Sequence, residues 1–251
     1  NANIDLGILN LNPYWPQSTA TQQMKSDNKA KSEPLVWDDS ELDLSALGLI
    51  NANIAIQSRQ LMVRKIKLGE NKLAVKMHNG IVIVKLLEFQ GYEGHGTGII
   101  EVAANNKPYQ ITSKFELANI NAEPLLTDAA GFDKLLGKGQ LAWNLSTKGI
   151  SQRDFINQLN GEVNFSFIDG AVKGVNLAAI AKSASNIMTG NLAAVSLDSD
   201  FSHAEKTDFA ALTGTFNISS GVAHTDNLAL NNPFIRVSGA GDVDLPQTKI
   251  K

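Results

Sequence analysis

Cysteine is absent from this chain of 251 residues. Without cysteine the protein cannot form disulfides, and cysteine-based zinc or iron–sulfur sites are excluded as well. A basic excess is also missing, because 22 Lys and Arg are outweighed by 25 Asp and Glu, which gives a formal net charge of −3. Aromatic residues are few, at 6%, and they are not interleaved with arginine. Nucleic acid is therefore not an expected partner.

Long apolar runs are missing too. The densest apolar stretch, residues 81–89, is interrupted by Lys85 and Glu88. It falls far short of the ~20 apolar residues that a membrane-spanning helix needs. The chain begins at Asn1 rather than Met, so we expect a processed or truncated protein. It is still long enough to bury about 70–75% of its unfolded surface in one or two domains.

The motifs of common catalytic sites are not found. There is no nucleophile elbow, phosphate-binding loop, dinucleotide fingerprint or H-E-x-x-H pair. The run Gly94–Gly98 lacks the lysine and the following helix of a phosphate loop, so close packing is the better interpretation. The four histidines show no ligand spacing, and Asp198, Asp200 and Asp226 lack the glycine and bidentate glutamate of a calcium loop. We expect no enzyme, no metal and no cofactor.

What the sequence does contain is alternation of apolar and polar residues. Residues 109–117, 141–145 and 162–167 show it most clearly. Successive side chains of a strand point to opposite faces, so each of these segments has one apolar face and one polar face. The fold class is therefore predicted as mainly β (α+β), a curved antiparallel sheet or β-groove. The residues predicted to line its apolar face are Tyr109, Ile111, Phe115, Leu141, Trp143, Leu145, Val163, Phe165, Phe167, Phe216, Ile218, Ile235, Val237 and Val243.

This apolar face must be covered by something. The commoner arrangement is a closed core beneath helices or a second sheet. Only about three short amphipathic helices are predicted: from Asn121 to Gly131, from the cap Ser151 to Gly161, and from Asn176 onward. So few helices for so many strands favour an open sheet with an apolar interior, in which an acyl chain is the ligand. Both arrangements stay open at this point.

The chain is expected to divide into three parts. Residues 1–12 form the end of an upstream β-domain, residues 13–39 form a polar, flexible linker or loop, and residues 40–251 form one β-rich domain. The linker is rich in Gln, Ser, Thr, Asn and Lys, and such a segment buries too little apolar surface to offset its ordering entropy. Within the domain, two sub-modules are expected over about 40–120 and 137–251.

The two sub-modules are inferred from an internal echo. Asp43–Leu47 resembles Asp208–Leu212, and each is followed by a glycine and then by an Asn-Ile pair. The alternative is that short strand sequences converge without a repeat.

Two dipeptides, Asn79-Gly80 and Asp169-Gly170, predict tight hairpin turns because such turns need residues that tolerate a positive φ.

Four segments carry a family resemblance. They are residues 139–149 (GQLAWNLSTKG), 159–177 (LNGEVNFSFIDGAVKGVNL), 207–222 (TDFAALTGTFNISSGV) and 232–245 (NPFIRVSGAGDVDL). Their order and spacing resemble the C-terminal region of the AsmA family, and the resemblance extends back to Ser40. That family comprises proteins of the Gram-negative periplasm that are anchored in the inner membrane. The resemblance implies a membrane anchor upstream of this chain and a periplasmic location.

The resemblance also implies a function. AsmA-family proteins are implicated in outer-membrane biogenesis and in moving phospholipid from the inner to the outer membrane along apolar β-grooves. We therefore expect a non-enzymatic protein that holds or conducts phospholipid acyl chains. The alternative is a periplasmic scaffold whose edge strands or loops bind outer-membrane assembly factors.

Overall fold

The computed structural model describes residues 2–14, 37–174, 206–233 and 236–250. As predicted, the protein is mainly β, and thirteen strands form one sheet. The strands are β1 (Ala2–Asn10), β2 (Ala52–Val63), β3 (Ile66–Leu68), β4 (Asn71–His78), β5 (Ile81–Gly91), β6 (Gly94–Ala103), β7 (Tyr109–Asn121), β8 (Leu135–Gly149), β9 (Asn160–Lys173), β10 (Lys206–Ser219), β11 (Val222–Asn231), β12 (Arg236–Asp244) and β13 (Lys249–Ile250). The helices among these residues are α1 (Ala122–Ala130) and α2 (Gln152–Asn157), with the 3-10 helices η1 (Asn12–Tyr14) and η3 (Ser45–Leu49).

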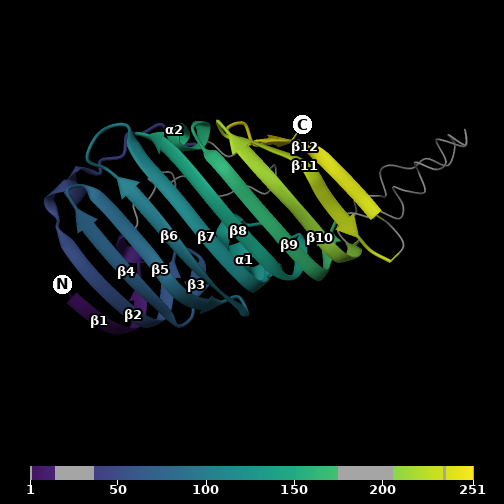
Figure 1. Ribbon diagram of the computed structural model, residues 1–251, viewed down its shortest axis with the longest axis horizontal. Helices are drawn as coiled ribbons and strands as arrows, with labels where there is room; N and C mark the ends of the chain where they lie inside the picture. The colour runs from purple at the N-terminus through teal and green to yellow at the C-terminus, as the bar shows by residue number, and fades with distance from the viewer. Residues whose placement is uncertain (1, 15–36, 175–205, 234–235, 251) are drawn as a thin grey trace, which may run out of the picture.

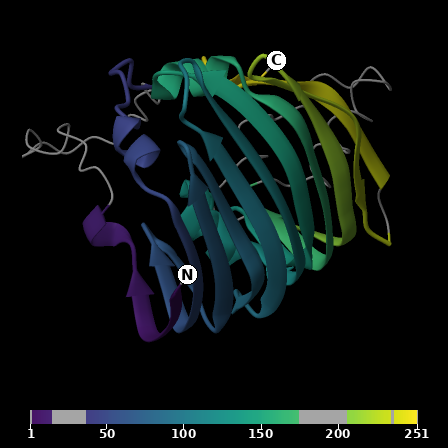
Figure 2. The ribbon, with the colours of Figure 1, turned by 60° about the vertical axis from the view of Figure 1, so that its left-hand side comes forward.

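The sheet is a meander bent into an open trough. Its order follows the sequence from β1 to β13, except that the short β3 pairs only with β2. Figures 1 and 2 show the bend, which puts α1 on the inner side of the curve. Every pairing is antiparallel except that of β1 with β2, which is parallel. The predicted antiparallel sheet is thus extended at this edge by one parallel strand. The chain leaves β1 at one end of the strands and must return to the other end before β2 begins.

The two predicted sub-modules are not confirmed. Strands β2 to β12 form one continuous ladder, with no break between the ranges 40–120 and 137–251. The two similar segments that suggested two modules also differ in structure. Asp43–Leu47 runs into the 3-10 helix η3, whereas Asp208–Leu212 lies inside strand β10. The similarity of the two segments is one of composition, and tertiary context gives them different backbones. The limits of the three expected parts remain predictions, although β1 joins the same sheet as β2.

Two of the three predicted helices are present. α1 begins after Asn121 and ends at Gly131, whose φ of 70° is the left-handed C-cap conformation that glycine adopts easily. α2 begins after Ser151, whose side chain accepts a hydrogen bond from the backbone N–H of Asp154. It ends at Asn157, earlier than predicted. The helix expected from Asn176 lies outside the described residues.

The two glycine dipeptides behave differently. Asn79-Gly80 forms the predicted tight turn between β4 and β5, with φ values of 49° and 75°. The hairpin predicted at Asp169-Gly170 is wrong. β9 continues through it to Lys173, and Asp169, with a φ of 48°, sits where the pairing with β8 shifts register. A residue that tolerates a positive φ serves a bulge as well as a turn.

Apolar packing divides into two clusters on the inner side of the sheet. One cluster is built on Leu61, Leu68, Leu73, Leu86, Phe89, Leu117 and Ile120, and the other on Ala122, Leu135, Phe167, Phe209 and Leu230. Helix α1 lies between them, because Leu125 packs against the first cluster and Leu126 against the second. The helix therefore joins the two halves of the sheet at one end of the strands.

The trough has two long rims formed by opposite ends of the strands. At the first, here called the α1 rim, lie α1 and the β5–β6 turn at Tyr92 and Glu93. At the second, here called the strap rim, lie α2 and the turn at Asn79-Gly80. Residues 37–51, here called the strap, run along this second rim.

Candidate functional site

The strand register places the predicted lining residues on one face of the sheet. Directly paired residues of neighbouring strands point to the same side. Phe115 pairs with Trp143, Trp143 with Val163, and Val163 with Phe216. In the same way Ile218 is linked through β11 to Val243. All members of the predicted set lie on this apolar face except Ile235, which lies outside the described residues.

The apolar face extends further toward the N-terminus than predicted. The pairing continues from Phe115 through Gly98 of β6 and Leu86 of β5 to Leu73 of β4. The predicted lining residues did not include these strands, although the alternation in β4 was a usable signal. The additional apolar residues, at regularly paired positions of β4 to β6, are Leu73, Val75, Met77, Val82, Val84, Leu86, Ile100 and Val102.

Charge is confined to the other face. Across β4 to β12, none of the regularly paired, described residues that share a side with Phe115 is charged. The neighbours one position along each strand face outward instead, and they include Lys85, Lys114 and Glu162. The outer face is thus an ordinary solvated surface, and the inner face offers no charged partner to a bound molecule.

The middle of the apolar face is a floor of partly exposed aromatic rings. Phe115 and Trp143 stack with ring centroids 4.7 Å apart, and Phe165 lies 6.1 Å from Phe216. These four side chains are neither exposed nor fully buried, so the described residues do not seal them from solvent. Other residues of this face are buried, among them Phe167 nearer the α1 rim, 3% exposed, and Leu86 of β5, 7% exposed.

The floor also hides its few polar groups. The indole Nε1–H of Trp143 donates a hydrogen bond to the Ser113 hydroxyl at 2.9 Å. Ser113 and, toward the strap rim, Tyr109 carry the hydroxyl groups among the regularly paired, described positions of β7 on this face. An indole N–H that already has a hydrogen-bond acceptor needs none from a ligand. The chemistry of the floor is therefore that of a hydrocarbon surface.

A recess deepens the trough at the α1 rim. It has a volume of about 330 Å³. Phe132 stands at its mouth, with 45% of its surface exposed. Gly239 contributes no side chain, and Leu228 packs closely against its backbone. The other lining residues are Leu135, Val172, Thr207, Leu212, Leu230 and Val237. A recess of this size and lining accepts the end of an apolar chain.

The titratable groups do not gather into a site on this face. Among the described residues, no three His, Asp or Glu side chains lie together in a way that would hold a metal ion. His224 contacts Asp242 at 2.7 Å, but their cross-strand pair faces outward. Asp198, Asp200 and His203 lie outside the described residues. In the part of the chain that the structure describes, no helix has the length and apolarity needed to cross a bilayer.

Comparison with known proteins agrees with the family resemblance, and the match includes the first three of the four segments. A family model described as the AsmA family matches residues 4–228, which is most of the chain. Neither the curated proteins nor the solved structures yield a match to this sequence. The chain belongs to the AsmA family.

Proposed function

We propose that this protein holds and conducts phospholipid acyl chains in the periplasm, tethered to the inner membrane through an anchor outside this chain, and that it catalyses no reaction. Three observations support this proposal. The inner face of the sheet is apolar and uncharged from β4 to β12, and the chain belongs to the AsmA family. The strongest support comes from the partly exposed aromatic floor, because a closed core would bury those rings.

The energetics favour an acyl chain as the occupant. Apolar surface removed from water contributes about 25 cal/mol per Å², or about 0.8 kcal/mol for each buried methylene. A lipid headgroup gains nothing on a floor without charged or unpaired polar partners, and burying it there is costly. The headgroup therefore stays in water while the chains lie against Phe115, Trp143 and Phe165.

The same geometry suggests how a lipid moves. Neighbouring strands lie about 4.8 Å apart, so the ladder from β2 to β12 spans roughly 40 Å. Along this distance a chain passes from one apolar side chain to the next without meeting a charge. Movement by diffusion needs no energy source within this chain, and its direction is set by the membranes at either end.

Substitution on the floor tests the proposal. Ile111→Asp and Phe165→Asp place a carboxylate on the inner face. Each is expected to abolish the phospholipid that co-purifies with the protein, measured by native mass spectrometry. Thr112→Asp is the matched control, because Thr112 is the exposed neighbour of Ile111 on the outer face. Wild-type protein without lipid, or equal lipid in Ile111→Asp and Thr112→Asp, would contradict the proposal.

A scaffold for outer-membrane assembly factors is the second candidate function. The observation in its favour is the sheet edge at β1, which ends the strand order and has Ile8 61% exposed. An unpaired edge strand is a template for another strand. Affinity purification that recovers a stoichiometric protein partner, together with no bound lipid, would favour the scaffold.

A further inference from the structure

The strap crosses the end of nearly the whole sheet. At its start, the indole Nε1–H of Trp37 donates to the backbone carbonyl of Leu245, just after β12, at 3.1 Å. At its end, the side chain of Asn51 accepts a hydrogen bond from the backbone N–H of Asn79, in the turn between β4 and β5. Two regions far apart along the ladder are thus joined by one short segment.

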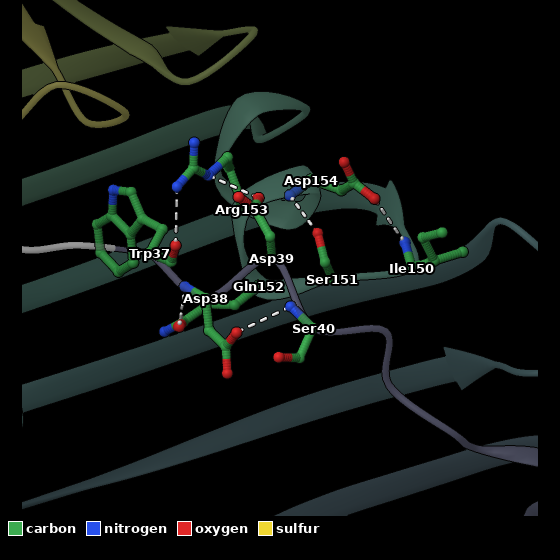
Figure 3. A network of polar contacts seen from close by, with 9 residues as sticks. All are labelled: Trp37, Asp38, Asp39, Ser40, Ile150, Ser151, Gln152, Arg153 and Asp154. Carbon is green, nitrogen blue, oxygen red and sulfur yellow. Dashed lines mark hydrogen bonds and ion pairs between the residues drawn. The ribbon is translucent and has the colours of Figure 1, made fainter. Parts of the chain in front are cut away.

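Between these ends the strap is fastened to the middle of the sheet, as Figure 3 shows in part. Arg153 of α2 donates its backbone N–H to the carbonyl of Asp38 at 3.0 Å, and its guanidinium contacts the carboxylate of Asp39 at 2.7 Å. The backbone N–H of Leu42 donates to the carbonyl of Ile150 at 2.8 Å. These contacts tie the strap to the β8–α2 connection.

The strap lies over the inner face rather than outside it. Tyr109 is the first residue of the apolar face on β7, and it is only 3% exposed. Its hydroxyl accepts the backbone N–H of Leu44 at 3.4 Å. Farther along, η3 lies beside β5. The strap therefore covers the apolar face at one rim and leaves the aromatic floor beyond it partly exposed.

The ion pairs that attach the strap are weak. The Arg153–Asp39 pair is exposed by 46% and 66% at its two side chains, and the Lys107–Glu41 pair by 55% and 51%. Exposed ion pairs of this kind contribute about 0–1 kcal/mol each and are screened by salt. The strand ladder beneath is a continuous set of backbone hydrogen bonds, so the strap detaches at much lower free energy than the sheet opens.

We infer that the strap is a releasable retaining band, which limits how far the strap rim opens and so controls the rate at which an acyl chain enters and leaves the trough. This inference rests on the proposed function. In this inference, residues 37–51 control how fast the acyl chain enters and leaves, whereas the floor determines how tightly the acyl chain binds. Affinity comes from the apolar side chains, whereas the exchange rate depends on detachment of the band.

A disulfide lock tests the inference, because the chain has no native cysteine to interfere. The backbone N–H of Leu42 donates to the carbonyl of Ile150, which brings the two backbones close together, and a disulfide forms where the Cα atoms lie about 4.4–6.8 Å apart. The double variant Leu42→Cys with Ile150→Cys is loaded with a pyrene-labelled fatty acid. Release of the fatty acid into phosphatidylcholine vesicles is then followed by fluorescence, once with the disulfide oxidised and once with it reduced. Oxidation is expected to slow release by about fivefold or more, the factor that one exposed pair of about 1 kcal/mol represents.

The control lock is Lys72→Cys with Glu88→Cys, a directly paired couple on the outer face. It cross-links the same sheet without touching the strap and is expected to leave the release rate within about twofold. Equal release from the oxidised and reduced strap lock overturns the inference while binding of the fatty acid keeps the proposed function intact. No binding by the wild-type protein overturns both, and the two failures are therefore distinguishable.

Loosening the strap gives the opposite result. Arg153→Ala removes the ion pair to Asp39 and the hydrogen bond to the carbonyl of Trp37, and alanine preserves α2 because of its high helix propensity. Release of the fatty acid is expected to become about twofold to fivefold faster, with bound amount unchanged at saturation. Lys72→Ala, which removes an exposed ion pair to Glu88 on the outer face, is the matched control. Equal rates in the two variants overturn the inference.

Discussion

The two rims of the trough are held by different kinds of contact. At the α1 rim, Ile120 is 0% exposed, and α1 joins both apolar clusters. At the strap rim, the ion pairs of Arg153 and Lys107 are about half exposed. Buried apolar contacts survive salt and acid, whereas exposed ion pairs do not. We therefore take the α1 rim as the fixed side of the trough and the strap rim as the side that opens.

The turn at Tyr92 and Glu93 shows how firmly the α1 rim is built. Both residues have a positive φ, 52° and 65°, without being glycine. Such a backbone is held only where surrounding contacts determine it. The Tyr92 carbonyl accepts the backbone N–H of Asn121, and its hydroxyl donates to Asp128 of α1 at 2.9 Å. The strain of the turn is therefore offset by its attachment to the helix.

Truncating the core of the α1 rim gives the largest expected effect. Ile120→Ala leaves a cavity in a fully buried position, which typically costs about 2–5 kcal/mol in the free energy of unfolding. Leu49→Ala at the strap rim removes a side chain that is 86% exposed and is expected to cost less than about 0.5 kcal/mol. Urea unfolding monitored by tryptophan fluorescence measures both. Similar losses in the two variants would show that the rims do not differ in this way.

Tyr92 gives an effect of intermediate size. Burial, and then its contact with Asp128, raises the pKa of Tyr92 from 10.0 to about 12. A raised pKa means that folding favours the neutral phenol, so its contribution is complete below pH 10 and is lost as the pH rises toward 12. We expect Tyr92→Phe to lose about 1 kcal/mol at neutral pH through its missing hydrogen bonds, and to lack this alkaline loss.

Thermal unfolding at a series of alkaline pH values checks the Tyr92 prediction. Tyr14→Phe is the control, because Tyr14 is 84% exposed. If Tyr92→Phe and the wild-type protein lose stability in parallel above pH 10, the phenol does not contribute to the α1 rim as described.

Acid gives the smallest effect, and it acts on the strap. Hydrogen bonds from Ser40 and Ser45 lower the pKa values of Asp38 and Asp43 below their ordinary value of 3.8. Depressed pKa values contribute stability that is present above the ordinary pKa and is lost as the pH falls through the lowered one. Below pH 3.8 the amide of Leu42 is therefore expected to lose exchange protection.

Hydrogen exchange, corrected for the intrinsic pH dependence of the amide rate, measures the acid prediction. The reference is the amide of Asn121, which is bonded to the Tyr92 carbonyl at the α1 rim. Glu93 also has a lowered pKa, through Lys138 and Asn121, but the apolar clusters continue to hold this rim. Earlier loss of protection at Asn121 than at Leu42 would reverse the assignment of fixed and opening rims.

Local patterns in the sequence predicted a large part of the apolar face. Alternation along 109–117 and 162–167 has a period that only a strand satisfies, so Phe115 and Phe165 were assigned correctly to one side. The starts of α1 and α2 after Asn121 and Ser151 are similarly local signals, although only the Ser151 side chain makes a capping hydrogen bond. Such features depend on a few neighbouring residues and are visible without knowing the fold.

Long-range features could not be predicted in this way. The bond between Trp37 and Leu245 joins residues separated by 208 positions, and no local pattern marks either partner. The parallel pairing of β1 with β2 likewise depends on where the intervening chain travels. The bulge at Asp169 was mistaken for a turn because the dipeptide specifies a backbone conformation and not the pairing around it.

The reach of the strap from β12 back to the β4–β5 turn has an evolutionary consequence. In a meander where each strand touches only its neighbours, adding or deleting a hairpin disturbs little else, as in repeat proteins. Here, however, the length of the strap restricts the number of strands, since its span has to equal the width of the strands it crosses. Insertion of a hairpin between β5 and β12 would therefore need a matching insertion in residues 37–51, and lineages that lengthen one without the other would lose the fastening at Trp37.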